Sequence, residues 1–391
     1  MNPTVQYPMF FDEGHGVTYE RAQEVAFQRI RPMEEQEEAP NEDMQARAFA
    51  SVIGDAGLAR YAVPKEYGGM KETVDIRSIC LIRESLASAS GFADSMFAMQ
   101  GLGSYPITLG GTHEQKQTWL PAVAKGERLC AFALTEANAG SDVVAMETRA
   151  ERKGSQYVLN GRKRYITNTG VAGSYVVFAK TDPEMGHRGI SAFIVTPDDP
   201  GFRVASRQRV TAPHPIGEIA LEDCLLNADR RIGAEGDGFK IAMGTLDRFR
   251  PTVGAAALGL GARALEEGLR HTQSRQQFGA PLFSLQAVQM LLAQGATDLE
   301  GARLLVYTAA WRADNGVDRI TLEAAMGKLS ATEAAFRLID SCVQVHGGAG
   351  VLVGGVPERL YREIRALRIY EGASDVQKLV IARNLAKRMK E

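Results

Sequence analysis

One carboxylate near the end of the chain lies in a stretch that could do acid–base chemistry. Glu371 stands between an aromatic residue, Tyr370, and a glycine, Gly372. The glycine leaves the backbone free in φ and ψ and lets a ligand come close to the Glu371 peptide N–H. A carboxylate beside such a donor could take a proton from a carbon next to a carbonyl group. The alternative is a surface glutamate in a loop, and these three residues alone do not separate the two.

The residues that follow Glu371 contain a helix-start signal. Ser374 is followed three residues later by Gln377, which is the spacing of a capping box. Three apolar residues would form the inward face of the helix that follows, namely Val376, Leu379 and Val380. We therefore expect Glu371 on a turn that precedes a helix.

Away from this turn the character of the chain changes twice, which indicates three domains. Helical periodicity dominates residues 1–126 and returns in long alanine-rich stretches over residues 234–391. Residues 127–233 consist of short β-favouring runs separated by turn residues. Helical patterns do not alternate with these runs, so a doubly wound parallel sheet is disfavoured. The expected order is a helical domain, a β domain and a helical bundle.

The pattern also places individual elements. Strands are expected at 130–134, 156–159, 163–167, 175–180, 191–196 and 218–225. Asn160-Gly161, between the second and third of these, is the dipeptide most typical of a two-residue hairpin. The main helices are expected at 18–31, 41–56, 74–89, 93–109, 255–269, 285–310 and 322–345.

Composition argues against several classes of function. The formal net charge of the 391 residues is −2, which gives no long-range attraction to nucleic acid or to an anionic membrane. The four cysteines are scattered and form no C-x-x-C pair, so neither a disulfide framework nor a metal site is expected. The first twenty residues carry acidic side chains and no Lys or Arg, unlike a targeting peptide. We expect a cytoplasmic protein without a nucleic-acid or membrane partner.

Four stretches, in the right order, resemble signatures of the acyl-CoA dehydrogenase family, and the resemblance runs from about Tyr61 to the C-terminus. They are LTEANAGSD at 134–142, RYITN at 164–168, RQQFG at 275–279 together with QVHGG at 344–348, and YEG at 370–372. In the second stretch Tyr165 stands where the family usually has tryptophan. The resemblance implies an α+β protein with an N-terminal α-helical domain, a middle β-barrel-like domain and a C-terminal four-helix bundle.

The same resemblance implies an FAD cofactor. Its contacts would come from Phe132, Leu134, Thr135, Gly140, Ser141, Tyr165, Thr167, Arg275, Phe278, Gln344, Gly347 and Gly348. A small turn such as Gly140-Ser141 can bring peptide N–H groups and a hydroxyl to a phosphate. Thr167 would face flavin N5, whereas Arg275 and Gln344 would reach a flavin held by a neighbouring subunit of a homotetramer, a dimer of dimers. Gly347-Gly348 follows a helix and lacks the G-x-G-x-x-G spacing, which excludes a Rossmann motif.

The family's catalytic base corresponds to Glu371. Some members place the base on the first long helix of the bundle, but that position is Phe249 here, which cannot take a proton. Arg250 corresponds to a family arginine near the base. The substrate would be bound by Ser141, Asp247, Arg250, Tyr370, Glu371 and Gly372. The implied reaction removes the α-proton of an acyl-CoA thioester to Glu371 and the β-hydrogen to the flavin as hydride, giving trans-2-enoyl-CoA.

One departure leaves the substrate open. The family commonly has an arginine and a serine where this chain has Ala212 and His214. The acyl group, its carrier (CoA or a carrier protein) and the electron acceptor (an electron-transfer flavoprotein or oxygen) therefore stay undecided, and an acyl thioester oxidase is the alternative function. A flavin monooxygenase is disfavoured by Glu371. A non-catalytic scaffold is disfavoured by the retained Thr135, Thr167 and Arg275.

Overall fold

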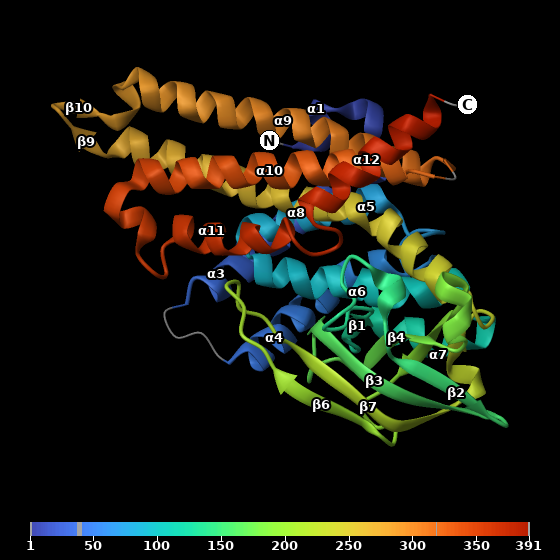
Figure 1. Cartoon of the computed structure of the whole chain (residues 1–391). Helices are drawn as coiled ribbons and strands as arrows, with labels where there is room; N and C mark the ends of the chain where they lie inside the picture. Colours follow the sequence, from blue (N-terminus) through green and yellow to red (C-terminus); the bar gives the residue numbers. More distant parts are fainter. Residues whose placement is uncertain (1, 37–40, 318, 390–391) are drawn as a thin grey trace. The chain divides into compact units, whose positions relative to one another are not determined.

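The structure is a computed structural model that describes residues 2–36, 41–317 and 319–389 (Figure 1). Its contacts group the chain into two compact units. The first unit comprises Met1–Glu35, Ile76–Asp94 and Asp247–Glu391, and the second comprises Gln36–Asp75 and Ser95–Leu246. Each unit thus joins segments that are far apart in the sequence. The expected domain boundaries near residues 126 and 233 stay a prediction, because this grouping does not test them.

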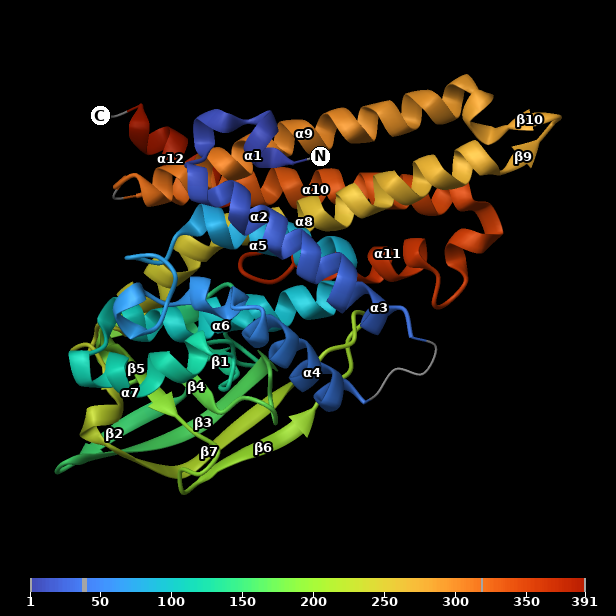
Figure 2. The ribbon, with the colours of Figure 1, turned by 180° about the vertical axis from the view of Figure 1, so that it is seen from behind.

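The first unit is built mainly from long helices. Its α-helices are α1 (Pro3–Gln6), α2 (Glu13–Val25), α3 (Arg31–Glu34), α5 (Ile76–Ala89), α8 (Gly238–Ser274, from Asp247 onward), α9 (Gln286–Asp314), α10 (Thr321–His346), α11 (Val356–Leu367) and α12 (Ser374–Arg388). Helix α10 packs against α9, α11 and α12, and α5 packs against α2 and α9. The helices α8, α9 and α10 lie side by side in opposite views, which is the expected bundle (Figure 2).

A glycine lets these three helices approach closely. A Cβ atom on Gly261 of α8 would lie 2.8 Å from Leu299 Cδ1 on α9 and 3.2 Å from Ala335 Cβ on α10. Leu299 and Ala335 are themselves buried. The bundle is therefore held by small residues packed against apolar ones, at the density of a protein interior.

The second unit combines helices with one mixed sheet. Its helices are α4 (Glu42–Asp55), α6 (Gly91–Gly110, from Ser95 onward) and α7 (His113–Ala124). Its strands are β1 (Cys130–Ala133), β2 (Arg149–Lys153), β3 (Gln156–Thr167), β4 (Ser174–Lys180), β5 (Ile190–Val195), β6 (Phe202–Arg207), β7 (Ile216–Asn227) and β8 (Arg231–Ile232). The hydrogen-bonded order is β6-β7-β3-β2-β4-β5-β8, and β1 pairs with β4.

Most neighbours in this sheet are antiparallel, and only the pairings of β4 with β1 and β2 are parallel among the described strands. The sheet is therefore not doubly wound, as the sequence indicated. Its core has aromatic side chains on both faces. Tyr157, Tyr175 and Phe193 lie in one buried cluster, and Phe178 lies in another together with Trp119 of α7. The expected fold class, α+β with helical and β parts, is confirmed.

The hairpin expected at Asn160-Gly161 is wrong. Both residues lie inside β3, where the register against β7 shifts between Leu159 and Gly161. A Cβ atom on Gly161 would lie 2.4 Å from Thr148 Oγ1, so the glycine serves a close approach inside a bulged strand. The two-residue turn lies instead between β2 and β3, where Lys153 pairs with Gln156.

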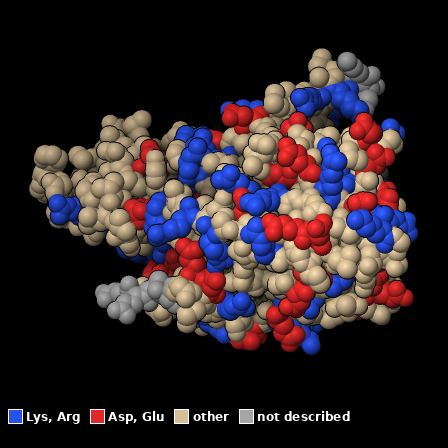
Figure 3. Space-filling model, turned by 60° about the horizontal axis from the view of Figure 1, so that its bottom comes forward, with Lys and Arg blue, Asp and Glu red and all other residues tan. Residues whose placement is uncertain are grey.

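Among the described residues, no helix has the length and apolar character required to cross a membrane. Lys and Arg side chains are interspersed with Asp and Glu over most of the face that Figure 3 presents. This mixture agrees with the small net charge of the sequence.

Candidate active site

The loop that carries Glu371 joins α11 to α12 and contains two residues with positive φ. Glu371 has φ 51° and Gly372 has φ 94°. Left-handed backbone is uncommon for a residue other than glycine. The prediction that Glu371 lies on a turn before a helix is confirmed.

The capping box predicted at the start of α12 is wrong. The N-cap is Ala373, and Ser374 is already the first helical residue. The Ser374 hydroxyl donates to Glu333 Oε1 at 2.6 Å, and Gln377 Nε2 donates to the Gly372 carbonyl at 3.0 Å. The predicted inward face of α12 is also wrong in part, because Leu379 is 56% exposed. These side chains anchor the loop rather than cap the helix.

Three consecutive carbonyl groups of the loop accept hydrogen bonds from side chains. Lys328 Nζ on α10 donates to the Tyr370 carbonyl at 3.1 Å and to the Gly372 carbonyl at 2.7 Å. Arg250 Nε on α8 lies 3.5 Å from the Glu371 carbonyl, the long limit of a hydrogen bond. The backbone around Glu371 is thus held from the bundle side.

The Glu371 side chain itself is poorly stabilised as an anion. Its Oε2 atom is inaccessible to solvent and has no hydrogen-bond partner among the described residues. Burial raises the pKa of this carboxyl, while the charges of Arg83, Lys328 and Arg250 oppose that rise and Asp94 adds to it. Within the described ranges, no group accepts a hydrogen bond from the Glu371 peptide N–H either. The residue therefore offers both an unpaired carboxylate oxygen and an unpaired donor.

Arg250 is fixed by a second acidic residue. Arg250 Nη1 donates to Asp247 Oδ1, and Thr321 Oγ1 donates to Asp247 Oδ2 at 2.7 Å. Arg250 is 8% exposed and Phe249 is 2% exposed. Asp247, expected to bind substrate, has one oxygen bonded to Arg250 and the other to Thr321, so its contacts orient the arginine.

A buried ion pair lies near Glu371. Its two residues belong to no family motif, so the sequence did not indicate it. Arg83 on α5 donates from Nε and Nη2 to Asp94 Oδ1 and Oδ2, at 2.9 and 2.7 Å, and from Nη1 to Thr252 Oγ1 at 2.9 Å. Burial raises the pKa of the Tyr370 hydroxyl far above its usual range, although Arg83 lowers it. Tyr370 is therefore neutral. Its hydroxyl and the Arg83–Asp94 pair are the polar groups next to the loop.

In the second unit the signature around Glu136 is held by a buried lysine. Glu136 Oε1 accepts from Lys163 Nζ at 2.7 Å and from Thr148 Oγ1 at 2.6 Å, and its Oε2 accepts from the Glu147 N–H at 2.6 Å. Burial lowers the pKa of Lys163 to about 8. The acidic residue of this signature thus ties the turn after β1 to β2 and β3 and contributes structure rather than a ligand contact.

Tyr165 presents its ring to solvent from a bulge in β3. Its φ is 58°, and its side chain is 56% exposed with the Arg164 guanidinium 5.1 Å from the ring centroid. The bulge shifts the register against β7 between Lys163 and Ile166. At the end of β3, Asn168 Nδ2 donates to the Cys130 carbonyl at 2.9 Å and ties β3 to β1.

Thr167 contacts the residue that departs from the family pattern. Its Oγ1 lies 3.4 Å from His214 Nε2, and His214 Nδ1 lies 2.9 Å from the Ala212 carbonyl. A carbonyl only accepts, so Nδ1 carries the proton and Nε2 accepts from the threonine. Burial lowers the pKa of His214, which keeps the imidazole neutral. His214 is therefore a neighbour of Thr167 rather than an unrelated loop residue.

The groups on this part of the second unit fit a flavin. Tyr165 supplies an exposed aromatic surface, and Thr135, Ser141 and Thr167 supply hydroxyl groups that are at least partly accessible. No atom lies within 4 Å of the place where Gly140 would carry a Cβ, so its peptide is open to a ligand. Phe132 is half-buried and Leu134 is buried. These two residues would therefore line the site with backbone atoms or with the side of a packed side chain, and not with an exposed side chain.

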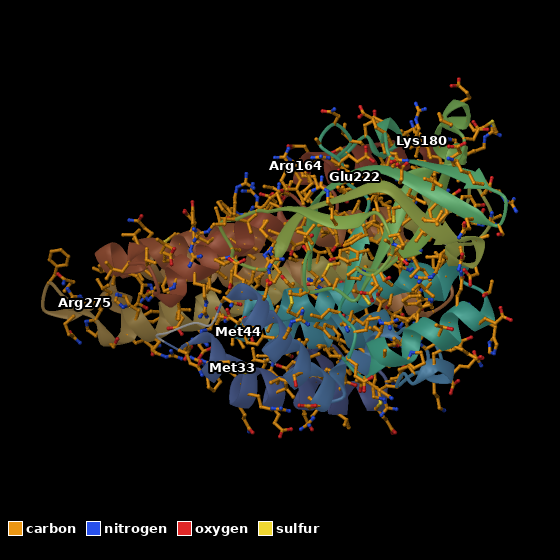
Figure 4. All side chains as sticks on the ribbon, turned by 90° about the horizontal axis from the view of Figure 1, so that it is seen from below. Met33, Met44, Arg164, Lys180, Glu222 and Arg275 are labelled. Carbon is orange, nitrogen blue, oxygen red and sulfur yellow. The ribbon has the colours of Figure 1, made fainter. Side chains whose placement is uncertain are left out.

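The remaining expected cofactor residues lie at one end of the first unit. Arg275 follows α8 directly and precedes the hairpin of β9 (Gln276–Gln277) and β10 (Ala280–Pro281), as Figure 4 shows. Phe278, at the tip of this hairpin, has φ 52° and is 91% exposed. Gln344, Gly347 and Gly348 are exposed at the end of α10. The described residues contain no cluster of His, Cys, Asp or Glu that could hold a metal ion.

Family models match nearly the whole chain. The model of the acyl-CoA dehydrogenase N-terminal domain matches residues 13–127, that of the middle domain residues 131–224, and that of the C-terminal domain residues 236–386. The chain belongs to the acyl-CoA dehydrogenase family. As a member of this family it is an oxidoreductase that acts on the CH–CH group of acyl-CoA thioesters and depends on a flavin.

Individual relatives agree with this assignment. A probable acyl-CoA dehydrogenase of Mycobacterium tuberculosis is 38% identical over 364 residues, which cover 91% of this chain and 93% of the relative. The structure of butyryl-CoA dehydrogenase from Megasphaera elsdenii superimposes with a TM-score of 0.90 at 32% identity, covering 96% of this chain and 99% of that one. A chain solved in work on the electron transferring flavoprotein of Acidaminococcus fermentans gives a TM-score of 0.90 at 36% identity, covering 96% and 98%.

Proposed function

We propose that this acyl-CoA dehydrogenase uses FAD and that Glu371 removes the α-proton of an acyl-CoA thioester, so that the product is trans-2-enoyl-CoA. The environment of the Glu371 carboxyl carries the proposal. A carboxylate that is buried and lacks hydrogen-bond donors on one oxygen is destabilised as an anion, which strengthens it as a base.

The backbone of the loop would act on the substrate carbonyl, and Arg250 of α8 would hold the base in position. The Glu371 peptide N–H is an unpaired donor that suits the oxygen on which negative charge develops as the α-proton leaves. Arg250 holds the Glu371 carbonyl and is itself oriented by Asp247. The flavin, when bound, accepts the β-hydrogen as a hydride.

We propose that the cofactor is FAD, held by two groups of residues. Tyr165 and Thr167 would contact the isoalloxazine ring, and the Gly140-Ser141 turn would face the phosphates. Arg275 suits a diphosphate, because its guanidinium donates two parallel charge-assisted hydrogen bonds. Phe278, Gln344, Gly347 and Gly348 would complete the adenosine side of a flavin held by a neighbouring subunit.

A homotetramer is part of this proposal. The exposed Phe278 would be covered in an assembly, together with the exposed Leu285, the N-cap of α9, and the exposed Met290 in the first turns of that helix. In Figure 3 the end of the molecule at the left shows few charged side chains, in line with an apolar contact surface. A cytoplasmic location is proposed as well.

The proposal also covers the acyl group of the substrate and the electron acceptor. His214 and Ala212 replace the residues that the family commonly has, so we propose an acyl-CoA whose acyl part differs from a plain straight chain, such as a branched or cyclic one. An electron-transfer flavoprotein is the proposed acceptor, supported by the likeness to a chain solved in work on an electron transferring flavoprotein. Oxygen uptake during turnover would instead point to an oxidase, and turnover of a carrier-protein thioester alone would exclude CoA.

Replacing Glu371 tests the proposed base. Glu371→Gln keeps the size of the side chain but cannot take a proton, so the rate of flavin reduction by an acyl-CoA should fall by ~10²-fold or more. Flavin content and acyl-CoA binding should be unchanged, because the amide preserves the loop contacts. The measurement is bleaching of the flavin absorbance in anaerobic stopped flow. A variant that bleaches at nearly the wild-type rate would exclude Glu371 as the base.

A further inference from the structure

Lys328 is a buried cation whose contacts surround the residue proposed as the base. Its side chain is 0% exposed, and its Nζ donates to the carbonyl groups of Tyr370 and Gly372, the neighbours of Glu371 on either side. Burying an ammonium group costs several kcal/mol unless partners offset the loss of water. A lysine kept in such a place requires a reason beyond packing, since an apolar residue of similar length would fill the space.

The backbone that Lys328 holds is in an unfavourable conformation. A non-glycine residue at φ 51° persists only when the contacts around it hold the backbone in that conformation. Lys328 Nζ holds the carbonyl of the peptide unit that joins Tyr370 to Glu371 and the carbonyl of the unit that joins Gly372 to Ala373, and Gln377 Nε2 donates to the second of these carbonyls as well. The Glu371 Cα belongs to the first of these planes, and the peptide unit between Glu371 and Gly372 is enclosed by the two, so these contacts restrict how the Glu371 side chain can turn.

We propose that Lys328 is a positioning residue of the active site, which clamps the peptide unit before Glu371 and the peptide unit after Gly372 and, through its charge, adjusts how readily the Glu371 carboxylate accepts a proton. This proposal rests on the role of Glu371 as the base. From α10 the sequence indicated only Gln344, as a flavin contact, and the proposal adds to this helix a part in holding the base.

The charges around Lys328 and Glu371 determine in which direction the loss of the ammonium shifts the pKa of Glu371. The pKa of Lys328 is lowered to about 8, because burial and the charge of Arg250 lower it more than the charges of Glu371 and Glu333 raise it. Burial and the charge of Asp94 raise the pKa of Glu371. The positive charges of Arg83, Lys328 and Arg250 lower it. Removal of the ammonium should therefore raise the pKa of Glu371.

The first experiment compares Lys328→Met with Lys328→Arg and with a control, Lys378→Met, in flavin-loaded enzyme. Lys378 lies on α12 close to the loop, but its side chain is 64% exposed and forms an ion pair with the exposed Asp375. Lys328→Met should reduce flavin more slowly by about 10²-fold, the effect of a misplaced reacting group. Lys328→Arg, which keeps the charge and the donors, should recover part of the rate, and Lys378→Met should match the wild type.

Two readouts separate positioning from a general loss of structure. In Lys328→Met the acidic limb of the pH profile of flavin reduction should move to higher pH, and hydrogen exchange of the peptide that covers residues 368–377 should be faster by ~10-fold. The control should change neither. An equal loss of rate at every pH, with unchanged exchange in the loop, would overturn the proposal.

A second experiment needs no substitution of Lys328, in case the variants do not fold. Two lysines, Lys328 and Lys163, should titrate near pH 8 in NMR spectra of enzyme with ¹³C-labelled lysine. In Glu371→Gln, which removes the attracting carboxylate, the pKa of Lys328 should fall further, whereas Lys163, paired with Glu136, should not change. If neither of the two low-titrating lysines responds, the coupling is absent and the proposal fails. Retained flavin reduction in Glu371→Gln would reject the base itself, which is a different outcome.

Discussion

At the scale of single residues, the site combines an ion pair and two buried cations with one under-stabilised carboxylate. The sequence identified Glu371 and Arg250 because both lie in recognisable motifs. The roles of Lys328, Arg83 and Asp94 are not visible in the sequence. Lys328 acts by hydrogen bonds to the loop at 368–377, and Arg83 and Asp94, paired with one another, act on Glu371 through their charges. A buried charge in an alanine-rich helix looks like any solvated lysine until the packing is known.

A second buried carboxyl permits a stability test at this scale. Glu363 on α11 is 7% exposed, and burial raises its pKa to about 8, with Glu34 adding to the rise and Arg359 opposing it. The unfolded chain releases this proton near its ordinary pKa of 4.5, whereas the folded chain holds it until about 8. The unfolded state therefore binds fewer protons in this window, and the carboxyl lowers the free energy of unfolding as the pH rises from about 4.5 to 8.

Glu363→Gln should remove this dependence. Its melting temperature should equal that of the wild type near pH 4.5 and exceed it above pH 8, measured by thermal unfolding across that range. If the variant is instead less stable at high pH, Glu363 is ionised in the folded protein and paired with Arg359, which lies 4.0 Å away.

At the scale of elements, the pattern of apolar and polar residues located most helices and strands. It failed where an element has few apolar residues or contains a residue that usually ends such an element. Strand β2 was missed because its residues are mostly charged and exposed, from Arg149 to Lys153. A helix was expected only at 255–269, whereas α8 begins at Gly238 and contains Pro251, which a helix can accommodate at the loss of one backbone hydrogen bond. The dipeptide Asn160-Gly161 gave a false hairpin, because a bulge uses the same residues.

The packing of the bundle predicts opposite outcomes for two glycines. Gly261→Leu should lower the free energy of unfolding by at least about 1–3 kcal/mol, because the new side chain would collide with Leu299 and Ala335. Gly301→Ala, at an exposed position inside α9 with open space around it, should raise it by up to ~1 kcal/mol. Urea unfolding of both variants measures the two values. An equal effect of the two substitutions would show that the three helices do not meet as described.

At the scale of the whole molecule, each compact unit carries a different part of the proposed machinery. The base, its clamp and the buried ion pair belong to the first unit, whereas Tyr165, Thr167 and the Gly140-Ser141 turn belong to the second. Family motifs marked both sets in the sequence, because each motif is local.

Assembly can be tested through the exposed hairpin. Phe278→Ser removes the most exposed aromatic contact of the β9–β10 tip and should convert a tetramer to smaller species and weaken flavin retention. Sedimentation velocity and the ratio of flavin to protein absorbance measure both effects. Met70→Ser, which changes an exposed apolar residue of the second unit, serves as the control. A wild-type protein that sediments as a monomer with full flavin content would contradict the proposed tetramer.

The central claim, that Glu371 is the group that takes the α-proton, can be measured apart from flavin reduction. An acyl-CoA with sulfur in place of C3 has an acidic α-hydrogen but cannot lose a β-hydride, so only the proton step remains. In D₂O the wild-type enzyme should exchange the α-hydrogens of this thioester for deuterium, followed by mass spectrometry, and Glu371→Gln should not exceed the rate in buffer. Exchange at the wild-type rate in the Glu371→Gln variant would contradict the account.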